Sequence, residues 1–227
     1  MKNRELAKIK KFITEEREIF FKIACNYISN ESIILDVGSG DGHFAKCINR
    51  SDVYMVDGNI ESVNNLKKQY KNVFHSTLPE LPFTDKQFNV IHCSHVIEHL
   101  SPENLYLTLK EFDRCLNDNG YLIISAPLLW NEFYDDLSHL KPYNPKVFEK
   151  YFTWNNPSCC TRSLISSNYT VKEKIFRYSL VELHSDVVNT SSPFLNSIFH
   201  YYYKAVKKLG FRSLEKSGFT LVLQKGN

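Results

Sequence analysis

Residues 34–44, with the sequence ILDVGSGDGHF, decide the fold. The mainly apolar start of this stretch is typical of a short buried strand, and the three alternate glycines that follow predict a turn into a helix. Glycines in such a turn let the backbone bend sharply and approach a ligand closely. The spacing is GxGxG, whereas dinucleotide-binding enzymes have GxGxxG. Asp36, two residues before the first glycine, disfavours a pyrophosphate and favours a ligand with an ammonium or sulfonium group.

Strand and helix patterns alternate along the chain around this turn. Short apolar runs predict strands at residues 33–37, 53–56, 73–74, 88–93, 121–125, 169–178 and 219–223. Apolar residues at helical spacing predict helices over 4–29, from about 42, over 60–70, from 101 to the glycine at 120, and around 195–209. Such alternation predicts an α/β fold with a mainly parallel, doubly wound sheet that helices cover on both faces.

We expect the 227 residues to form a single domain. Its parts are an N-terminal helix (1–30), a cofactor-binding core (31–127), substrate-facing insertions (128–217) and a final strand (218–227). The segments 128–168 and 184–217 interrupt the regular alternation. Because open α/β sheets bind ligands beyond the carboxyl ends of their strands, these late segments are expected to face the substrate.

Composition indicates an ordinary globular protein, with 43% apolar and 23% charged residues. The formal net charge of +3 is too small to indicate nucleic-acid binding by itself. The six cysteines show no metal-finger spacing, which favours reduced thiols. We find no signal peptide and no membrane-spanning segment, and therefore expect a cytoplasmic protein; association with a membrane surface stays open.

Further segments support a specific resemblance. Asp57 lies seventeen residues after Gly40, at the end of the second predicted strand, where an acid can accept both ribose hydroxyls of an adenosine. The segments LPF (81–83), FNVI (88–91), VIEH (96–99) and NGYL (119–122) then follow in order. Together with the glycine turn, this set resembles class I S-adenosylmethionine-dependent methyltransferases over roughly residues 30–127.

The resemblance implies a Rossmann-like sheet of seven strands with the last antiparallel, S-adenosylmethionine as cofactor and S-adenosylhomocysteine as product. Two positions depart from the family pattern: Thr77 stands where an adenine-binding aspartate is common, and Asn89 replaces another aspartate. The cofactor-binding residues that we expect are Asp36, Gly38, Ser39, Gly40, Gly42, Asp57, Gly58, Asn59, Thr77, Leu78, Cys93 and Ser94.

Two histidines are the candidates for the catalytic base. His139 lies in a stretch that resembles the SHxxxYxP segment of methyltransferases acting on sugars and glycan precursors, and histidine titrates near neutral pH. His95 belongs to the string HVIEH, whose polar residues would share one face of a helix. This string has the pattern of some zinc peptidases, and quinone-biosynthesis methyltransferases carry a metal site in the corresponding stretch. Its position inside the methyltransferase segments excludes the peptidase interpretation, and we assign no metal ligand.

The main functional hypothesis is methyl transfer to a hydroxyl of a small polar acceptor, such as a sugar or glycan precursor. The sequence does not name the acceptor, so a quinone, a lipid or a natural product stays open, as does a non-catalytic cofactor-binding module. An NAD-dependent oxidoreductase is disfavoured by the glycine spacing and Asp36. The tyrosines at 201–203 and the nearby lysines could contact RNA, but such helices more often bury their aromatics, so we do not expect a nucleic-acid partner. Oligomeric state is not predicted.

Overall fold

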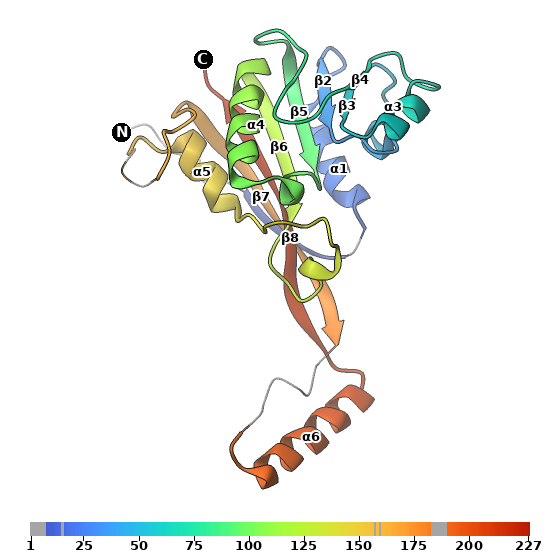
Figure 1. Ribbon diagram of the computed structural model, residues 1–227, viewed down its shortest axis with the longest axis vertical. Helices are drawn as coiled ribbons and strands as arrows, with labels where there is room; N and C mark the ends of the chain where they lie inside the picture. Colours follow the sequence, from blue (N-terminus) through green and yellow to red (C-terminus); the bar gives the residue numbers. More distant parts are fainter. Residues whose placement is uncertain (1–7, 15, 157, 159, 183–189) are drawn as a thin grey trace.

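The computed structural model describes residues 8–14, 16–156, 158, 160–182 and 190–227. Its centre is one eight-stranded sheet with the strand order β1-β7-β8-β6-β5-β2-β3-β4 (Figure 1). The strands are β1 (Lys8–Ile13), β2 (Ile34–Val37), β3 (Tyr54–Asp57), β4 (Val73–His75), β5 (Phe88–Ser94), β6 (Leu116–Pro127), β7 (Tyr169–Glu182) and β8 (Arg212–Lys225). The helices are α1 (Glu18–Ala24), α2 (His43–Cys47), α3 (Ile60–Leu66), α4 (Pro102–Cys115), α5 (Pro145–Thr153) and α6 (Pro193–Lys208).

Strand direction confirms the predicted fold class. Strands β2 to β6 pair in parallel, whereas β8 is antiparallel to both of its neighbours, β6 and β7. The chain therefore has the mixed, doubly wound sheet that we expected, with the last strand reversed. The prediction of seven strands was incomplete, because β1 adds an eighth strand parallel to β7.

The prediction of one helix over residues 4–29 was wrong. Residues 8–13 form β1, and α1 begins only at Glu18. The free edge of β7 offers a row of backbone partners, and β1 pairs with it along its whole length, from Lys8↔Glu173 to Ile13↔Tyr178. Phe12 packs edge-on against Phe20, with ring centroids 6.2 Å apart. Long-range strand pairing therefore overrides the local helical pattern.

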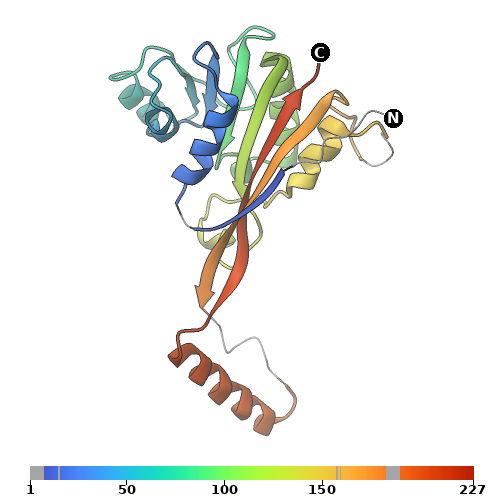
Figure 2. The same ribbon diagram turned by 180° about the vertical axis from the view of Figure 1, so that it is seen from behind.

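Two apolar clusters cover the two faces of the sheet. On one face, α4 and α5 bury Leu109, Phe112, Phe148 and Phe152 against the strands. On the other face, the cluster includes Phe21 of α1 with residues of α2 and α3. Figure 2 shows α1 on the side of the sheet opposite α4. These clusters hold the carboxyl ends of β2, β3 and β5 at one common edge.

Helix α5 lies inside the segment in which we found no regular period. Asn144 caps it by accepting a hydrogen bond from the backbone N–H of Lys146 at 3.0 Å, and Pro145 occupies its first turn. The local signals for this helix were therefore present in the sequence. Helix α4 ends at Cys115, earlier than the predicted stop, because the chain enters β6 at Leu116.

The β7–β8 pair continues beyond the rest of the sheet as a two-stranded ribbon. Pairing runs on from Tyr178↔Lys216 to Glu182↔Arg212, so β8 begins at Arg212, well before the predicted start. Helix α6 lies at the far end of this ribbon, away from the body of the protein (Figures 1 and 2). None of the described helices is both long enough and apolar enough to cross a bilayer.

Candidate functional site

The glycine turn after β2 has left-handed backbone angles at three positions. Gly38, Gly40 and Gly42 have φ values of +72°, +54° and +77°, which side-chain-bearing residues rarely adopt. A Cβ at Gly38 would lie 2.1 Å from Cγ2 of Val96, so the backbone there is packed against the protein. A Cβ at Gly40 would meet no described heavy atom within 4 Å. The turn is therefore closed at Gly38 and open to a ligand at Gly40.

Asp57 is held beside the open part of the turn. Its Oδ2 accepts a hydrogen bond from the N–H of Gly40 at 2.8 Å, and its Oδ1 accepts one from the N–H of Asn59 at 2.8 Å. Asn59 in turn caps α3 by accepting from the N–H of Glu61. These bonds fix the carboxylate at the end of β3 and leave its remaining lone pairs for hydroxyl donors.

Thr77, which the sequence analysis assigns to the adenine side of the cofactor, lies close to the loop that follows Asp57. A Cβ at Gly58 would lie 3.9 Å from the Thr77 hydroxyl oxygen, so the loops after β3 and β4 meet there. His75 Nε2 lies 3.0 Å from the carbonyl oxygen of Gly58 and joins the same loops. Leu78 follows Thr77 and is only partly buried. The predicted adenine-side residues are thus neighbours of Asp57 in space.

Asp36 has a partner that the sequence analysis missed. Its side chain is buried, and its Oδ1 accepts a hydrogen bond from Nδ1 of His92 on β5 at 2.7 Å. The His92 ring stacks on Phe44 at a centroid distance of 3.7 Å. The Ser39 hydroxyl donates to the Asp36 carbonyl at 2.8 Å. Asp36 and His92 are register partners on adjacent strands, a relation that appears only after β2 and β5 are paired.

The two predicted cofactor residues at the end of β5, Cys93 and Ser94, differ in their surroundings. Cys93 is fully buried in the core on the α4 face, and burial raises the pKa of its thiol well above the ordinary value. Ser94 is only partly buried and lines a small cavity together with Arg17 and Thr220. If Cys93 contacts a ligand, its backbone rather than its thiol is the available group.

His95 lies outside any helix, so the expected one-face arrangement of the HVIEH string was wrong. It has a left-handed φ of +54°, and a 3-10 turn follows at Ile97–His99. Burial lowers the pKa of His95 to about 3. A neutral imidazole with so low a pKa is a weak proton acceptor, so its surroundings disfavour His95 as a general base.

A second, larger cavity adjoins His95 at the carboxyl edge of the sheet. It contains His139, the other predicted base, and joins residues from the loop after β6 to residues of β7. The lining residues are Arg17, His95, Glu98, His99, Pro127, Trp130, Glu132, Asp136, His139, Arg177 and Ser179. The structure therefore brings the two predicted catalytic histidines to one cavity. Val96, the residue after His95, packs against the glycine turn at Gly38.

The loop after β6 fixes the orientation of His139. Its Nδ1 donates a hydrogen bond to the Phe133 carbonyl at 2.6 Å, which leaves Nε2 as the nitrogen with a free lone pair. Asp136 Oδ2 lies 3.9 Å from this Nε2. Hydrogen bonds from Ser138 lower the pKa of Asp136, so a carboxylate stands beside the ring.

Glu98, His99 and His139 form a cluster with the spacing of metal ligands. One ligand atom from each lies within 4.8 Å of the other two. His99 Nδ1 donates to the Ser138 carbonyl at 3.0 Å, so the Nε2 atoms of both histidines keep their lone pairs. Glu98 is buried, and its Oε2 has no hydrogen-bond partner among the described residues. Burial raises the pKa of this carboxyl. The three residues can therefore hold a divalent cation.

Comparison with known proteins places this architecture among enzymes. A family model described as a methyltransferase domain matches residues 6–156. An uncharacterised protein of Methanocaldococcus jannaschii is 28% identical over 122 residues, which are 52% of this chain and 52% of that protein. The chain thus spans about half the length of the curated relative that it matches.

Solved structures share the fold over most of the chain. A SAM-dependent methyltransferase of Archaeoglobus fulgidus is 20% identical with a TM-score of 0.59, and the match covers 92% of each chain. The YcgJ protein of Bacillus subtilis is 18% identical with a TM-score of 0.58, covering 92% of this chain and 97% of that one. A SAM-dependent methyltransferase of Methanosarcina mazei is 16% identical with a TM-score of 0.53, covering 90% and 97%.

Proposed function

The chain belongs to the methyltransferase domain family, and from this premise we propose that it transfers a methyl group from S-adenosylmethionine to a hydroxyl of a small polar acceptor, such as a sugar or glycan precursor. The observation that carries the proposal is the pairing of an open glycine turn with a fixed acid. Gly40 leaves space for a ligand, and Asp57 holds a carboxylate beside that space.

The residues present fit the cofactor. The Asp57 carboxylate can accept hydrogen bonds from two ribose hydroxyls, and the proximity of Thr77 to Gly58 supports an adenine contact at the loop after β4. The solved methyltransferases with this fold are named as SAM-dependent, which supports the same cofactor here. When bound, S-adenosylmethionine supplies an electrophilic methyl group on a positively charged sulfur.

The acceptor is proposed to bind in the cavity around His139. The hydrogen bond from Nδ1 to Phe133 presents Nε2 as the base that takes the proton of the acceptor hydroxyl. Asp136 then stabilises the imidazolium that forms, since its carboxylate lies 3.9 Å away. Trp130 lines the same cavity and offers an aromatic face on which a sugar ring can pack, beside the polar side chains of Glu132 and Asp136.

A divalent cation at Glu98, His99 and His139 is a second candidate for activating the hydroxyl. The unpartnered Glu98 oxygen and the two free imidazole nitrogens favour it. Imidazole ligands suit zinc, iron or cobalt better than magnesium or calcium. A bound cation lowers the pKa of a coordinated hydroxyl, and His139 would then be a ligand instead of the base. Tight Co²⁺ binding, seen as a visible absorption band that His99→Ala abolishes, supports the cation; activity that survives a chelator unchanged contradicts it.

The experiment that tests the proposed reaction is a mass-shift screen with purified protein. Deuterated-methyl S-adenosylmethionine is mixed with pools of sugars, nucleotide sugars, quinones, lipids and natural products, and products that carry the label are identified. A labelled sugar or glycan precursor supports the proposal, and a labelled quinone, lipid or natural product replaces the proposed acceptor class. Cofactor binding with no labelled product in any pool favours a non-catalytic S-adenosylmethionine-binding module.

A further inference from the structure

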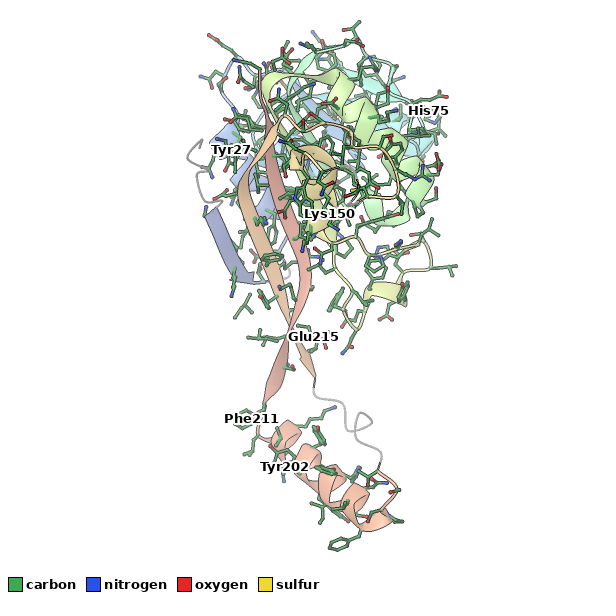
Figure 3. The ribbon with its side chains drawn as sticks, turned by 90° about the vertical axis from the view of Figure 1, so that its left-hand side faces the viewer. Tyr27, His75, Lys150, Tyr202, Phe211 and Glu215 are labelled. Carbon is green, nitrogen blue, oxygen red and sulfur yellow. The ribbon has the colours of Figure 1, made fainter. Side chains whose placement is uncertain are left out.

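Among the α-helices that the structure describes, α6 alone contributes no buried residue. It is held away from the body by the β7–β8 ribbon, and Figure 3 shows Tyr202 and Phe211 at this far end of the molecule, with Glu215 on the ribbon above them. The expectation that this helix buries its aromatic residues was wrong. Large apolar side chains there are exposed instead, namely Phe194, Leu195, Ile198, Tyr201, Tyr202 and Leu209.

The helix is strongly amphipathic. Phe194, Ile198, Tyr202 and Leu209 recur at spacings of four, four and seven residues, which places them along one face. Lys204 and Lys208 lie on the opposite face of the helix. They follow Tyr202 by two and by six residues, and at 3.6 residues per turn both offsets point away from the apolar stripe. An exposed apolar stripe of this length on a monomeric surface marks an interaction site.

Positive charge is concentrated in the same segment. Residues 190–214 contain three lysines and one arginine and no aspartate or glutamate. Without these four cations, the chain has 24 basic residues and 25 acidic ones. The basic character of the protein therefore belongs to α6 and its flanks, at one end of the molecule, while the rest of the chain is close to neutral.

We propose that α6 docks on an anionic membrane surface. Its apolar face would lie at the boundary between the lipid headgroups and the acyl chains, and Lys204 and Lys208 would reach the lipid phosphates. Aromatic side chains such as Tyr201 and Tyr202 suit this boundary, since each has an apolar ring and a polar hydroxyl. A helix with an aromatic and aliphatic face, and with a polar face whose charged residues are all cationic, has the composition of an interfacial helix.

Charge complementarity disfavours the other occupants of this face. Two copies of α6 packed against each other would bring their like-charged rims together, with no carboxylate in residues 190–214 to pair with them. Single-stranded nucleic acid would satisfy the cations, but Leu195, Ile198 and Leu209 offer it neither hydrogen bonds nor a stacking face. An anionic lipid surface satisfies the cations and the apolar stripe together.

The base of the ribbon connects this surface to the cavity. Ser179 on β7 donates a hydrogen bond to Ser217 on β8 at 2.8 Å, and both are buried. The N–H of Asn131, from the loop after β6, donates to Glu215 at 3.1 Å. Ser179 also lines the cavity that contains His139. Docking of α6 would therefore hold that cavity at a fixed height above the membrane.

Vesicle co-sedimentation of the full-length protein tests the proposal. Vesicles of phosphatidylcholine alone are compared with an equimolar mixture of phosphatidylcholine and phosphatidylglycerol at low and at physiological salt. We expect binding to the anionic vesicles that weakens as salt rises, because surface charges are screened. Failure to sediment with anionic vesicles at low salt, or equal binding to the neutral ones, overturns the proposal.

Paired variants separate charge from the apolar face. Removing two cations with Lys204→Ser and Lys208→Ser should weaken binding about 25-fold, at roughly five-fold for each lysine near the surface. The matched control, Lys67→Ser with Lys71→Ser, removes the same charge from the body and should leave binding unchanged. Ile198→Ser with Tyr202→Ser should weaken it by at least about ten-fold through lost apolar burial. S-adenosylmethionine affinity, which depends on the body alone, reports that each variant is folded.

Other patterns of results identify a different occupant and overturn the proposal. A dimer in gel filtration that Ile198→Ser with Tyr202→Ser dissolves, together with no vesicle binding, assigns the face to a second copy of the chain. Binding of a single-stranded oligonucleotide that depends on Lys204 and Lys208 but not on Ile198, again without vesicle binding, assigns it to nucleic acid. Equal losses from the α6 and body lysine pairs would show that attraction is non-specific.

Discussion

The site lies along one edge of the sheet, and its β2–β3 side and its β7–β8 side are formed by different kinds of groups. On the β2–β3 side, tight turns with positive φ and backbone N–H groups hold Asp57, so the geometry is carried by the main chain. On the β7–β8 side, the cavity is made of side chains from a long loop and a ribbon, with His139 oriented by a single carbonyl. Under the proposed function, the first side binds a constant ligand, and the second could change its acceptor with few substitutions.

The largest effect should follow from Asp57→Ala on the main-chain side. The variant loses two hydrogen bonds to the ribose, each worth ~1.5–3 kcal/mol with a charged acceptor, so the affinity for S-adenosylmethionine should fall about 10²–10⁴-fold. Isothermal titration calorimetry measures it. Glu31→Ala removes an exposed acid elsewhere and serves as the control. An unchanged dissociation constant for Asp57→Ala would mean that the ribose acid is another residue.

His139→Ala should have an effect of similar or smaller size, but on turnover instead of affinity. Positioned proton transfer contributes about 10²–10⁴-fold, so kcat should fall by that factor while the affinity for the cofactor stays the same. His139→Asn should be nearly as inactive, because an amide cannot accept the proton. His200→Ala, an exposed histidine on α6, is the matched control. A loss of less than about ten-fold would show that positioning alone suffices or that the base is elsewhere.

Alanine at two glycines separates folding from binding within the turn. Gly38→Ala should destabilise the protein by about 2–5 kcal/mol, since it combines a left-handed φ with a methyl group forced into Val96. Gly40→Ala should cost only about 1–2 kcal/mol of stability, because no described atom opposes its Cβ, yet it should weaken cofactor binding. Denaturant unfolding and calorimetry measure the two effects. Equal losses of stability in the two variants would contradict the claim that the turn is packed at Gly38 and open at Gly40.

At neutral pH the smallest effect is expected for His95, whose contribution to stability depends on pH. A histidine whose pKa falls from 6.5 to about 3 on folding binds fewer protons in the folded state, so it lowers stability as pH falls through that window. His95→Asn, which tolerates the left-handed backbone, removes this penalty. The free energy of unfolding of the variant, relative to that of the wild type, should therefore rise as the pH falls from 6.5 to about 3. A pH-independent difference would contradict burial as the cause.

The main-chain side of the site could be predicted because its determinants are local. The three glycines lie within five residues, Asp57 and Asn59 are two residues apart, and Asp57 follows Gly40 by only seventeen residues, so their spacing in the sequence carries the geometry. His92 could not be predicted as the partner of Asp36, since the contact depends on the pairing of β2 with β5. Strand β1 was missed for the same reason, because the edge of β7 that stabilises it lies about 165 residues away in the chain.

The cavity side was predicted only in part. His139 and the HVIEH string were singled out separately, but nothing local indicated that His99 and His139 would face each other with ring centroids 5.0 Å apart. The ribbon and the exposed position of α6 also follow from long-range pairing, whereas the sequence showed the helix itself. Local patterns therefore predict the elements, and the pairing of distant strands decides which side chains share a site.

Calorimetric titration of the purified wild-type protein with S-adenosylmethionine, S-adenosylhomocysteine and NAD tests the central claim most directly. We predict that the first two bind at one site per chain, that each displaces the other, and that NAD does not bind. This preference for the sulfur-containing ligands over NAD follows from the glycine spacing, the open face at Gly40 and the fixed Asp57 carboxylate. Tight binding of NAD together with no heat from either sulfur-containing ligand would contradict the account.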